Sequence, residues 1–178
     1  MANPSTLYRF RIELSDVDRS LYESLDFRVA MHPSESMDYL VTRVLAYCLN
    51  FDPVLELLPG LCAGDDPALR ITGTHGEILL WIDIGNPSPR RIHKSAKAAR
   101  TVKIYTYKDP EALRREVAGE KVHRADEIGC FALDSRFLGA LAHLLTRDNR
   151  WSVVHQDGEL VISIGEESVL GSLTRFSL

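Results

Sequence analysis

The sequence predicts an α/β protein with a mixed central β-sheet and flanking helices. An apolar run at residues 78–84 is typical of a strand that is covered on both of its faces. A helix start at Pro89 and a second strand at 101–107 follow it, and this order of strand, helix and strand predicts a parallel crossover. Alternating apolar and polar residues near both ends of the chain predict additional antiparallel strands. With 178 residues, of which 45% are hydrophobic, we expect one domain spanning 1–178.

The first third of the chain predicts a strand pair and a helix. Residues 6–14 alternate between apolar and polar side chains, and residues 25–31 form a second strand-like segment after a turn. Together they predict an antiparallel pair with one buried face. Apolar residues then recur at helical spacing up to Leu49, with Ser34 as the predicted N-terminal cap. Glu35 lies in the first turn of this predicted helix, where the helix dipole favours negative charge by about 0.3 to 1 kcal/mol.

The segment 51–77 is rich in proline and glycine and predicts a long loop with at most one short helix, at 54–58. Loops of this length are often functional. Asp65 and Asp66 lie at its centre, directly before Pro67. Adjacent acids before a proline are typical of a solvated turn, and they are also suitable oxygen ligands for Mg²⁺.

The second half of the chain predicts four further elements after the strand at 101–107. We assign each of them from its periodicity, its β-branched content or its turn residues. They are a helix at 110–117, a strand at 127–133, a helix at 137–145, and a hairpin of strands at 151–155 and 159–164. The Asp157-Gly158 dipeptide between the last two strands is a strong hairpin signal.

Composition argues against several classes of protein. The formal charge of −4 gives no overall attraction to nucleic acid, so binding of an anion must come from a local patch. Cys48, Cys62 and Cys130 form no CxxC pair, which argues against a thiolate zinc site, and the histidines lack HExxH spacing. The N-terminus has no apolar signal core, and no apolar run approaches the ~20 residues that span a membrane. We therefore expect a cytoplasmic protein without a membrane segment.

Asp83 is the one charged residue in the apolar strand at 78–84. An ionised carboxylate in such a strand costs about several kcal/mol unless it is paired, hydrogen-bonded or bound to a cation. The sequence therefore predicts that Asp83 has a partner or lies at a strand end that opens into a cleft.

The helix that begins at Pro89, with Ser88 as its cap, carries an unusual charge distribution. Arg90, Arg91, His93 and Lys94 crowd its first turns. Cations are disfavoured at the positive end of the helix dipole, so a nearby anion would relieve the conflict. That anion is a phosphate group or Asp83 itself.

Four separate positions together suggest a metal-dependent chemistry. They are Glu35 at a helix start, Asp65 or Asp66 in the loop, Asp83 late in a strand, and Lys94 on the next helix. Mg²⁺ takes one or two carboxylates and completes its octahedron with water and phosphate oxygens. Hydrolysis of a phosphodiester also needs a positioned water and a cation beside the developing charge, which a lysine supplies.

Several short motifs in register resemble the YaeQ family of bacterial proteins. These motifs are HPSE at 32–35, GLCAGDDP at 60–67, LWIDIG at 80–85 and RRIHK at 90–94. The resemblance runs over the whole chain. It implies a variant of the PD-(D/E)xK nuclease-like fold, with additional antiparallel strands around the common core.

The resemblance also implies roles for individual residues. Glu35 matches the helix glutamate of the superfamily, Asp66 matches the aspartate near its second core strand, with Asp65 as the alternate, and Asp83 matches the acid on its third strand. The lysine that usually follows two residues after this acid is replaced by Gly85. Lys94 is then the lysine that reaches the site from the neighbouring helix.

The leading hypothesis is a nuclease-like protein that uses Mg²⁺, or alternatively Mn²⁺, to act on phosphodiesters in nucleic acid. Asp66 and Asp83 would bind the metal and Glu35 would orient its ligand shell. Lys94 would place the water or offset charge, and Arg91 would bind phosphate.

Two alternatives remain open at this point. In the first, the protein is a non-catalytic module linked to transcription, which keeps the fold and uses the basic helix to bind nucleic acid or a protein partner. The absence of a lysine at Gly85 favours this alternative. In the second, the acids are structural, and Asp83 forms an ion pair with Arg91 or Lys94.

Overall fold

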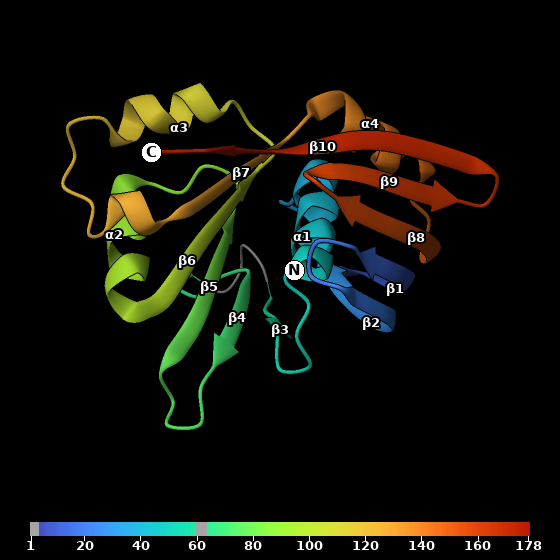
Figure 1. Ribbon diagram of the computed structural model, residues 1–178, viewed down its shortest axis with the longest axis horizontal. Helices are drawn as coiled ribbons and strands as arrows, with labels where there is room; N and C mark the ends of the chain where they lie inside the picture. The colour runs from blue at the N-terminus through green and yellow to red at the C-terminus, as the bar shows by residue number, and fades with distance from the viewer. Residues whose placement is uncertain (1–3, 60–63) are drawn as a thin grey trace.

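The fold is a ten-stranded mixed β-sheet with helices on both of its faces, as seen in a computed structural model that describes residues 4–59 and 64–178 (Figure 1). The strand order across the described residues is β2-β1-β8-β9-β10-β7-β6-β5-β4-β3. The strands are β1 (Thr6–Asp16), β2 (Leu21–Met31), β3 (Glu56–Leu57), β4 (Leu69–Thr72), β5 (Ile78–Ile84), β6 (Ala99–Thr106), β7 (Gly129–Leu133), β8 (Asp148–Gln156), β9 (Glu159–Ile164) and β10 (Glu167–Phe176). The helices are α1 (Met37–Leu49), α2 (Pro89–Ala98), α3 (Pro110–Val117), α4 (Ser135–Leu144) and the short 3-10 helix η2 (Ala125–Glu127). Of the described helices, none is both long and apolar enough to cross a membrane.

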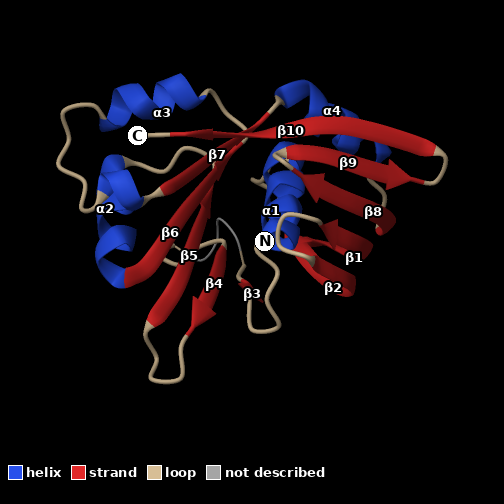
Figure 2. Ribbon diagram, in the orientation of Figure 1, coloured by secondary structure: helices blue, strands red, loops and turns tan. Residues whose placement is uncertain are grey.

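The sheet bends into two arms that enclose helix α1 (Figures 1 and 2). One arm holds β3 to β7 and the other holds β1, β2, β8 and β9. Strand β10 joins the arms, because its first half pairs with β9 and its last four residues, 173–176, pair with β7. Helices α2 and α3 lie outside the first arm.

The described residues form two hydrophobic cores, one on each face of the first arm. The larger core surrounds α1 and contains Leu40 and Leu45 together with Phe10 from β1 and Ile162 from β9. The smaller core lies between β5, β6, α2 and α3, and it includes Ile92 of α2. Strands β5 and β6 are therefore covered on both faces, as the apolar run at 78–84 predicts.

Most of the predicted elements are confirmed. Strands β5, β6 and β7 run parallel, with α2 and α3 as the crossover helices. β1 and β2 form the predicted antiparallel pair, and β8 and β9 form the predicted hairpin. The residues Asp157 and Gly158 at its turn both have positive φ angles, 51° and 78°, as a tight hairpin turn requires.

Three local predictions were wrong. The segment 51–77, predicted as a loop with at most one short helix at 54–58, contains the strands β3 and β4, because Glu56 and Leu57 pair with β4 and β4 pairs with β5. Helix α1 begins at Met37, and its cap is Ser36, whose Oγ accepts the Tyr39 N–H at 3.1 Å. Consequently Glu35 precedes the helix and does not lie in its first turn.

Strand β10 was not predicted, because its sequence ESVLGSLTRF lacks a regular alternation of apolar residues. Its central residue Gly171 lies against the ring of Phe137 on α4. A Cβ atom at this position would lie 2.4 Å from that ring, and Phe137 is buried in the larger core. The close approach of α4 to β10 therefore depends on a glycine at this position.

We expect the Gly171→Ala variant to be destabilised by about 1 to 3 kcal/mol, because the added methyl group forces the buried Phe137 ring to move. Gly139, in the interior of α4, is the matched control, since no atom lies within 4 Å of the position that an added methyl group would take. Gly139→Ala should raise the free energy of unfolding by about 0.5 to 1 kcal/mol through helix propensity. Chemical denaturation measures both effects, and equal changes in the two variants would contradict the packing argument.

Candidate functional site

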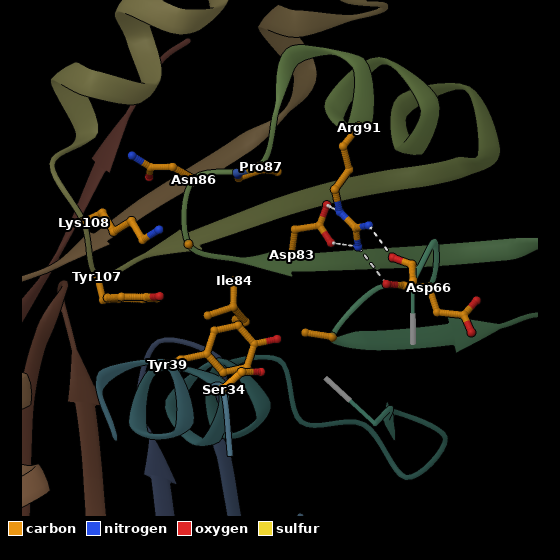
Figure 3. Close-up of a pocket in the computed structure, with 13 residues that line it drawn as sticks. Ser34, Tyr39, Asp66, Asp83, Ile84, Asn86, Pro87, Arg91, Tyr107 and Lys108 are labelled. Atoms are coloured by element: carbon orange, nitrogen blue, oxygen red, sulfur yellow. Dashed lines mark hydrogen bonds and ion pairs between the residues drawn. The ribbon is translucent and has the colours of Figure 1, made fainter. Parts of the chain in front are cut away.

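A cavity at the carboxyl ends of β5 and β6 has a volume of about 420 Å³ (Figure 3). Asp66, Asp83 and Arg91 line one side of it, and Tyr39 and Lys108 line another. The carboxyl ends of parallel strands are a common position for ligand sites in α/β proteins. The cavity is therefore the candidate functional site of the described chain.

Asp83 and Arg91 form a two-point ion pair at this cavity (Figure 3). Arg91 Nε lies 3.0 Å from Asp83 Oδ2, and Arg91 Nη2 lies 2.7 Å from Asp83 Oδ1. Asp83 is only 3% exposed, and the Arg91 guanidinium also lies 5.7 Å from the centre of the Trp81 ring. The pairing with Arg91 agrees with the prediction that the buried Asp83 carboxylate has a partner.

The position of Arg91 follows from the local sequence. Ser88 caps α2 by accepting the Arg91 N–H at 3.3 Å, which places Arg91 in the first turn directly beside the end of β5. Burial lowers the pKa of Arg91, but the hydrogen bond and the charge of Asp83 outweigh this effect and raise the pKa above its ordinary value. The Arg91 guanidinium therefore keeps its positive charge at neutral pH.

Arg91 also holds the preceding loop in place. Its Nη1 donates to the carbonyl oxygen of Gly64 at 3.1 Å, and its Nη2 donates to the carbonyl oxygen of Asp66 at 2.7 Å. One side chain thus connects α2, β5 and the loop that forms the cavity wall.

The two loop acids face different partners. The carboxylate of Asp66 points away from Asp83, and its Oδ1 lies 4.0 Å from Arg70 Nη1 (Figure 3). Asp65 accepts from Lys94, with 2.7 Å between Oδ2 and Nζ, and this bond lowers the pKa of Asp65. The side chains of Lys94 and Asp65 are 53% and 87% exposed, so they form a surface pair. Residues 60–63 of the GLCAGDDP motif, Cys62 among them, lie outside the described residues.

Glu35 is buried at the start of α1, where its carboxylate meets a buried cation. Its Oε2 accepts the His32 N–H at 3.2 Å, and its Oε1 lies 3.7 Å from Arg43 Nη1. Arg43 is 1% exposed, and its Nη2 donates to the carbonyl oxygen of Ala30 at 2.6 Å. The Glu35 carboxylate is therefore held by the backbone N–H of His32, directly after β2, and by the Arg43 side chain of α1.

Of the predicted site residues, the structure brings Asp66, Asp83 and Arg91 together around one cavity. Lys94 and Glu35 are engaged elsewhere, with Asp65 and Arg43. Within residues 4–59 and 64–178, no group of three or more His, Cys, Asp or Glu side chains is arranged to hold a metal ion. Asp83 and Asp66 are the acids that line the cavity. To share a divalent ion, Asp83 would have to release Arg91 and the Asp66 carboxylate would have to turn toward Asp83.

Comparison with known proteins agrees with this architecture over nearly the whole chain. The sequence profile described as YaeQ protein matches residues 1–172. The chain belongs to the YaeQ family. It is 29% identical over 175 residues to the YaeQ protein of Escherichia coli strain K12, covering 98% of this chain and 97% of that one.

Two crystal structures share the fold of this YaeQ-family chain. The YaeQ protein from Pseudomonas syringae superposes with a TM-score of 0.91 at 26% identity, over 99% of this chain and 98% of that one. The YaeQ protein from Xanthomonas axonopodis pv. citri superposes with a TM-score of 0.90 at 31% identity, over 97% of this chain and 98% of that one.

Gly85 of this YaeQ-family chain ends strand β5 with a φ angle of +92°. This left-handed conformation favours glycine, and a side chain there would be strained. A Cβ atom added at this position would also lie 3.5 Å from the Tyr107 ring. The chain therefore turns at the position where the PD-(D/E)xK pattern would have its lysine.

The cavity residues that were not predicted from the sequence include Tyr39, Tyr107 and Lys108. The rings of Tyr39 and Tyr107 meet edge to face with their centroids 6.3 Å apart, and Lys108 Nζ lies 5.6 Å from the centre of the Tyr107 ring. Burial raises the pKa of Tyr39 to about 12, so its hydroxyl is neutral at physiological pH. The signal for Tyr107 and Lys108 was their position directly after a parallel strand.

We expect Arg91→Met to lower the free energy of unfolding by about 3 to 5 kcal/mol, because it leaves a buried carboxylate without its cation. The double variant Asp83→Asn with Arg91→Met should lose less than Arg91→Met alone, since no charge is then left unpaired. Lys94→Met breaks an exposed pair and should change stability by about 1 kcal/mol or less. Urea denaturation of the four proteins tests this ranking, and an Arg91→Met variant as stable as Lys94→Met would contradict it.

Proposed function

We propose that this YaeQ-family protein is a non-catalytic nucleic-acid-binding module whose contact surface is the basic face of α2. The observation that carries the proposal is the arrangement of cations on this helix. Arg90, Lys94 and Lys97 are exposed and are spaced by four and three residues, which places them on one helical face. Helix α2 contains no aspartate or glutamate.

Two of the three charges on this face, those of Arg90 and Lys94, are not placed to stabilise the helix. Arg90 and Lys94 lie in the first half of α2, close to the positive end of its dipole, where cations are disfavoured. Bound phosphate groups would offset this repulsion, and lysine and arginine contacts to phosphate dominate non-specific affinity for nucleic acid. Since the whole chain has a net charge of −4, the attraction would be local to this helix.

The cavity supports a binding role over a catalytic role. Both carboxylate oxygens of Asp83 are engaged by Arg91. Gly85 occupies the position, two residues after Asp83, where the PD-(D/E)xK pattern has a lysine, and it supplies no side chain there. A hydrolytic site would need these groups to be available to a metal ion and a water molecule.

We also propose that β4 to β7 together with α1 and α2 are a variant of the PD-(D/E)xK nuclease-like core. Three features support this relationship: an acid beside the start of α1, an acid late in β5, and parallel strands joined by α2. The strands β1, β2, β8 and β9 would then be additions to that core.

The binding proposal predicts that the triple variant Arg90→Ala, Lys94→Ala, Lys97→Ala loses affinity for nucleic acid. Wild type should bind labelled DNA or RNA with a dissociation constant of roughly 10⁻⁴ to 10⁻⁶ M, typical of non-specific binding. For duplex DNA, removal of three phosphate contacts should reduce the slope of log affinity against log salt by about 2.7. Fluorescence anisotropy across a salt series measures both quantities.

The matched control is the triple variant Arg136→Ala, Arg147→Ala, Arg150→Ala, which removes three exposed cations that lie on α4, on β8 and just before β8. It should bind like wild type. Equal losses in both triple variants would indicate a charge effect without a defined surface. Absence of binding by wild type at low salt would refute the proposal.

The second candidate function is divalent-metal-dependent hydrolysis of phosphodiesters. One observation favours it: Asp66 and Asp83, the predicted metal ligands, line the same cavity at the end of β5. In this case Arg91 would move from Asp83 to substrate phosphate and Mg²⁺ or Mn²⁺ would take its place. Glu35 and Lys94, which do not line the cavity, would have to leave Arg43 and Asp65 to reach the metal or its water.

The metal hypothesis predicts that wild type binds Mn²⁺ and that Asp83→Asn weakens this binding at least tenfold. Titration calorimetry, with circular dichroism to show that the variant is folded, measures the difference. Asp148→Asn, an exposed acid that pairs with Arg11 on the other arm, is the control and should bind as wild type does. Equal affinity in wild type and Asp83→Asn would rule out the assigned metal site.

A further inference from the structure

Strand β2 forms a free edge of the sheet. Its eleven residues pair with β1 along their whole length, and the strand order ends with β2. Among the described strands, β1 is the one that pairs with it. A long unpaired edge exposes a row of backbone donors and acceptors, which another strand can use.

The direction of these backbone groups follows from the contacts of β1. The Arg9 N–H donates to the Arg147 carbonyl oxygen at 2.9 Å, and the Arg9 carbonyl oxygen accepts from Asn149 Nδ2 at 3.2 Å. Both backbone groups of Arg9 therefore face β8. In an antiparallel pair, the residue opposite, Arg28, must then direct its own N–H and C=O away from β1, toward the free edge.

The same direction holds for alternate residues along β2, which are Tyr22, Ser24, Asp26, Arg28 and Ala30. The carbonyl oxygen of Ala30 already accepts from Arg43. The central residues Ser24, Asp26 and Arg28 thus offer the backbone groups for a new strand.

We propose that β2 pairs in antiparallel fashion with β2 of a second copy of this chain, in the register that places Asp26 of each copy opposite Arg28 of the other. This register follows from charge complementarity. On the outer face it creates two reciprocal ion pairs across the two-fold axis. On the inner face it places Leu25 opposite Val29 and brings the two Phe27 rings together at the axis.

Phe27 fits this position. Its side chain is partly buried, and it stacks on Phe10 with the ring centroids 5.7 Å apart. With Arg9, Asp26 and Arg28 it lines a surface hollow of about 370 Å³ at the edge of the sheet. Residues opposite one another without mutual hydrogen bonds have Cα atoms about 4.5 Å apart, close enough for the two Phe27 rings to contact each other.

Other registers are less favourable. Sliding the partner by two residues one way sets Asp26 against Asp26, and sliding it by two residues the other way sets Arg28 against Arg28. Like charges directly opposite one another are destabilising. A slide by one residue would turn the apolar face of the partner toward solvent.

The carboxylate of Asp26 is already oriented for a second cation. Arg9 holds it through two bonds, Nε to Oδ1 at 2.9 Å and Nη2 to Oδ2 at 2.6 Å. A carboxylate has about four lone-pair sites, so Asp26 can accept from Arg28 of the second copy without releasing Arg9. Arg9 therefore orients the Asp26 carboxylate in each single chain, before two chains associate.

Analytical ultracentrifugation with a charge exchange tests this surface. Wild type should sediment at twice the chain mass of 20.0 kDa. Arg28→Asp alone and Asp26→Arg alone should each halve the mass, because every cross-strand pair becomes a like-charge pair. An equimolar mixture of the two variants should return to twice the chain mass, since the chain with acids at both positions then faces the chain with arginines at both.

Two further variants separate the edge from general effects of charge and folding. Arg28→Pro removes an outward N–H, which an edge strand tolerates, and should give a folded single chain by circular dichroism. Arg136→Asp, on the exposed side of α4, should remain at twice the chain mass. Wild type at the mass of one chain, an Arg28→Asp variant at twice that mass, or a mixture that stays at the mass of one chain would each overturn the proposal.

Discussion

The ion pair between Asp83 and Arg91 is the interaction on which the cavity depends. Asp83 lies late in a strand that is covered on both faces, so its charge requires a partner there. Arg91 reaches it from the first turn of α2 and then donates to two carbonyl groups of the loop at 64–66. The same guanidinium therefore neutralises the strand acid, fixes the start of the helix against the sheet, and shapes the wall of the cavity.

Helix geometry divides the cations of α2 into two groups with different roles. Arg91 lies on the side of the helix that contacts β5, close to the buried Ile92. Arg90, Lys94 and Lys97 lie on the exposed side. A run of basic residues that looks uniform in the sequence thus supplies one structural cation and three surface cations.

The two arms of the sheet bring together segments that are far apart in the sequence. Strand β10 makes this possible, because it leaves β9 and continues onto β7 within ten residues. The core around α1 is consequently shared by both arms. The free edges of the sheet lie at β2 and β3, and β2 is the longer of the two by nine residues, eleven against two.

The sequence by itself determined the elements whose periodicity reflects a simple environment: the half-buried β1, the apolar β5, the amphipathic α1, and the β8 and β9 hairpin with its Asp157-Gly158 turn. It also determined that Asp83 needs a partner, because a carboxylate in an apolar strand has few stable alternatives. Only the tertiary structure decided that Arg91, and not Lys94, is that partner, and that Arg43 balances Glu35. It likewise decided that β10 exists, since Gly171 and its neighbours carry no regular pattern. The periodicity of a segment indicates which of its residues are buried. Which side chains form ion pairs depends instead on the distances between elements, and these distances are set only in the folded chain.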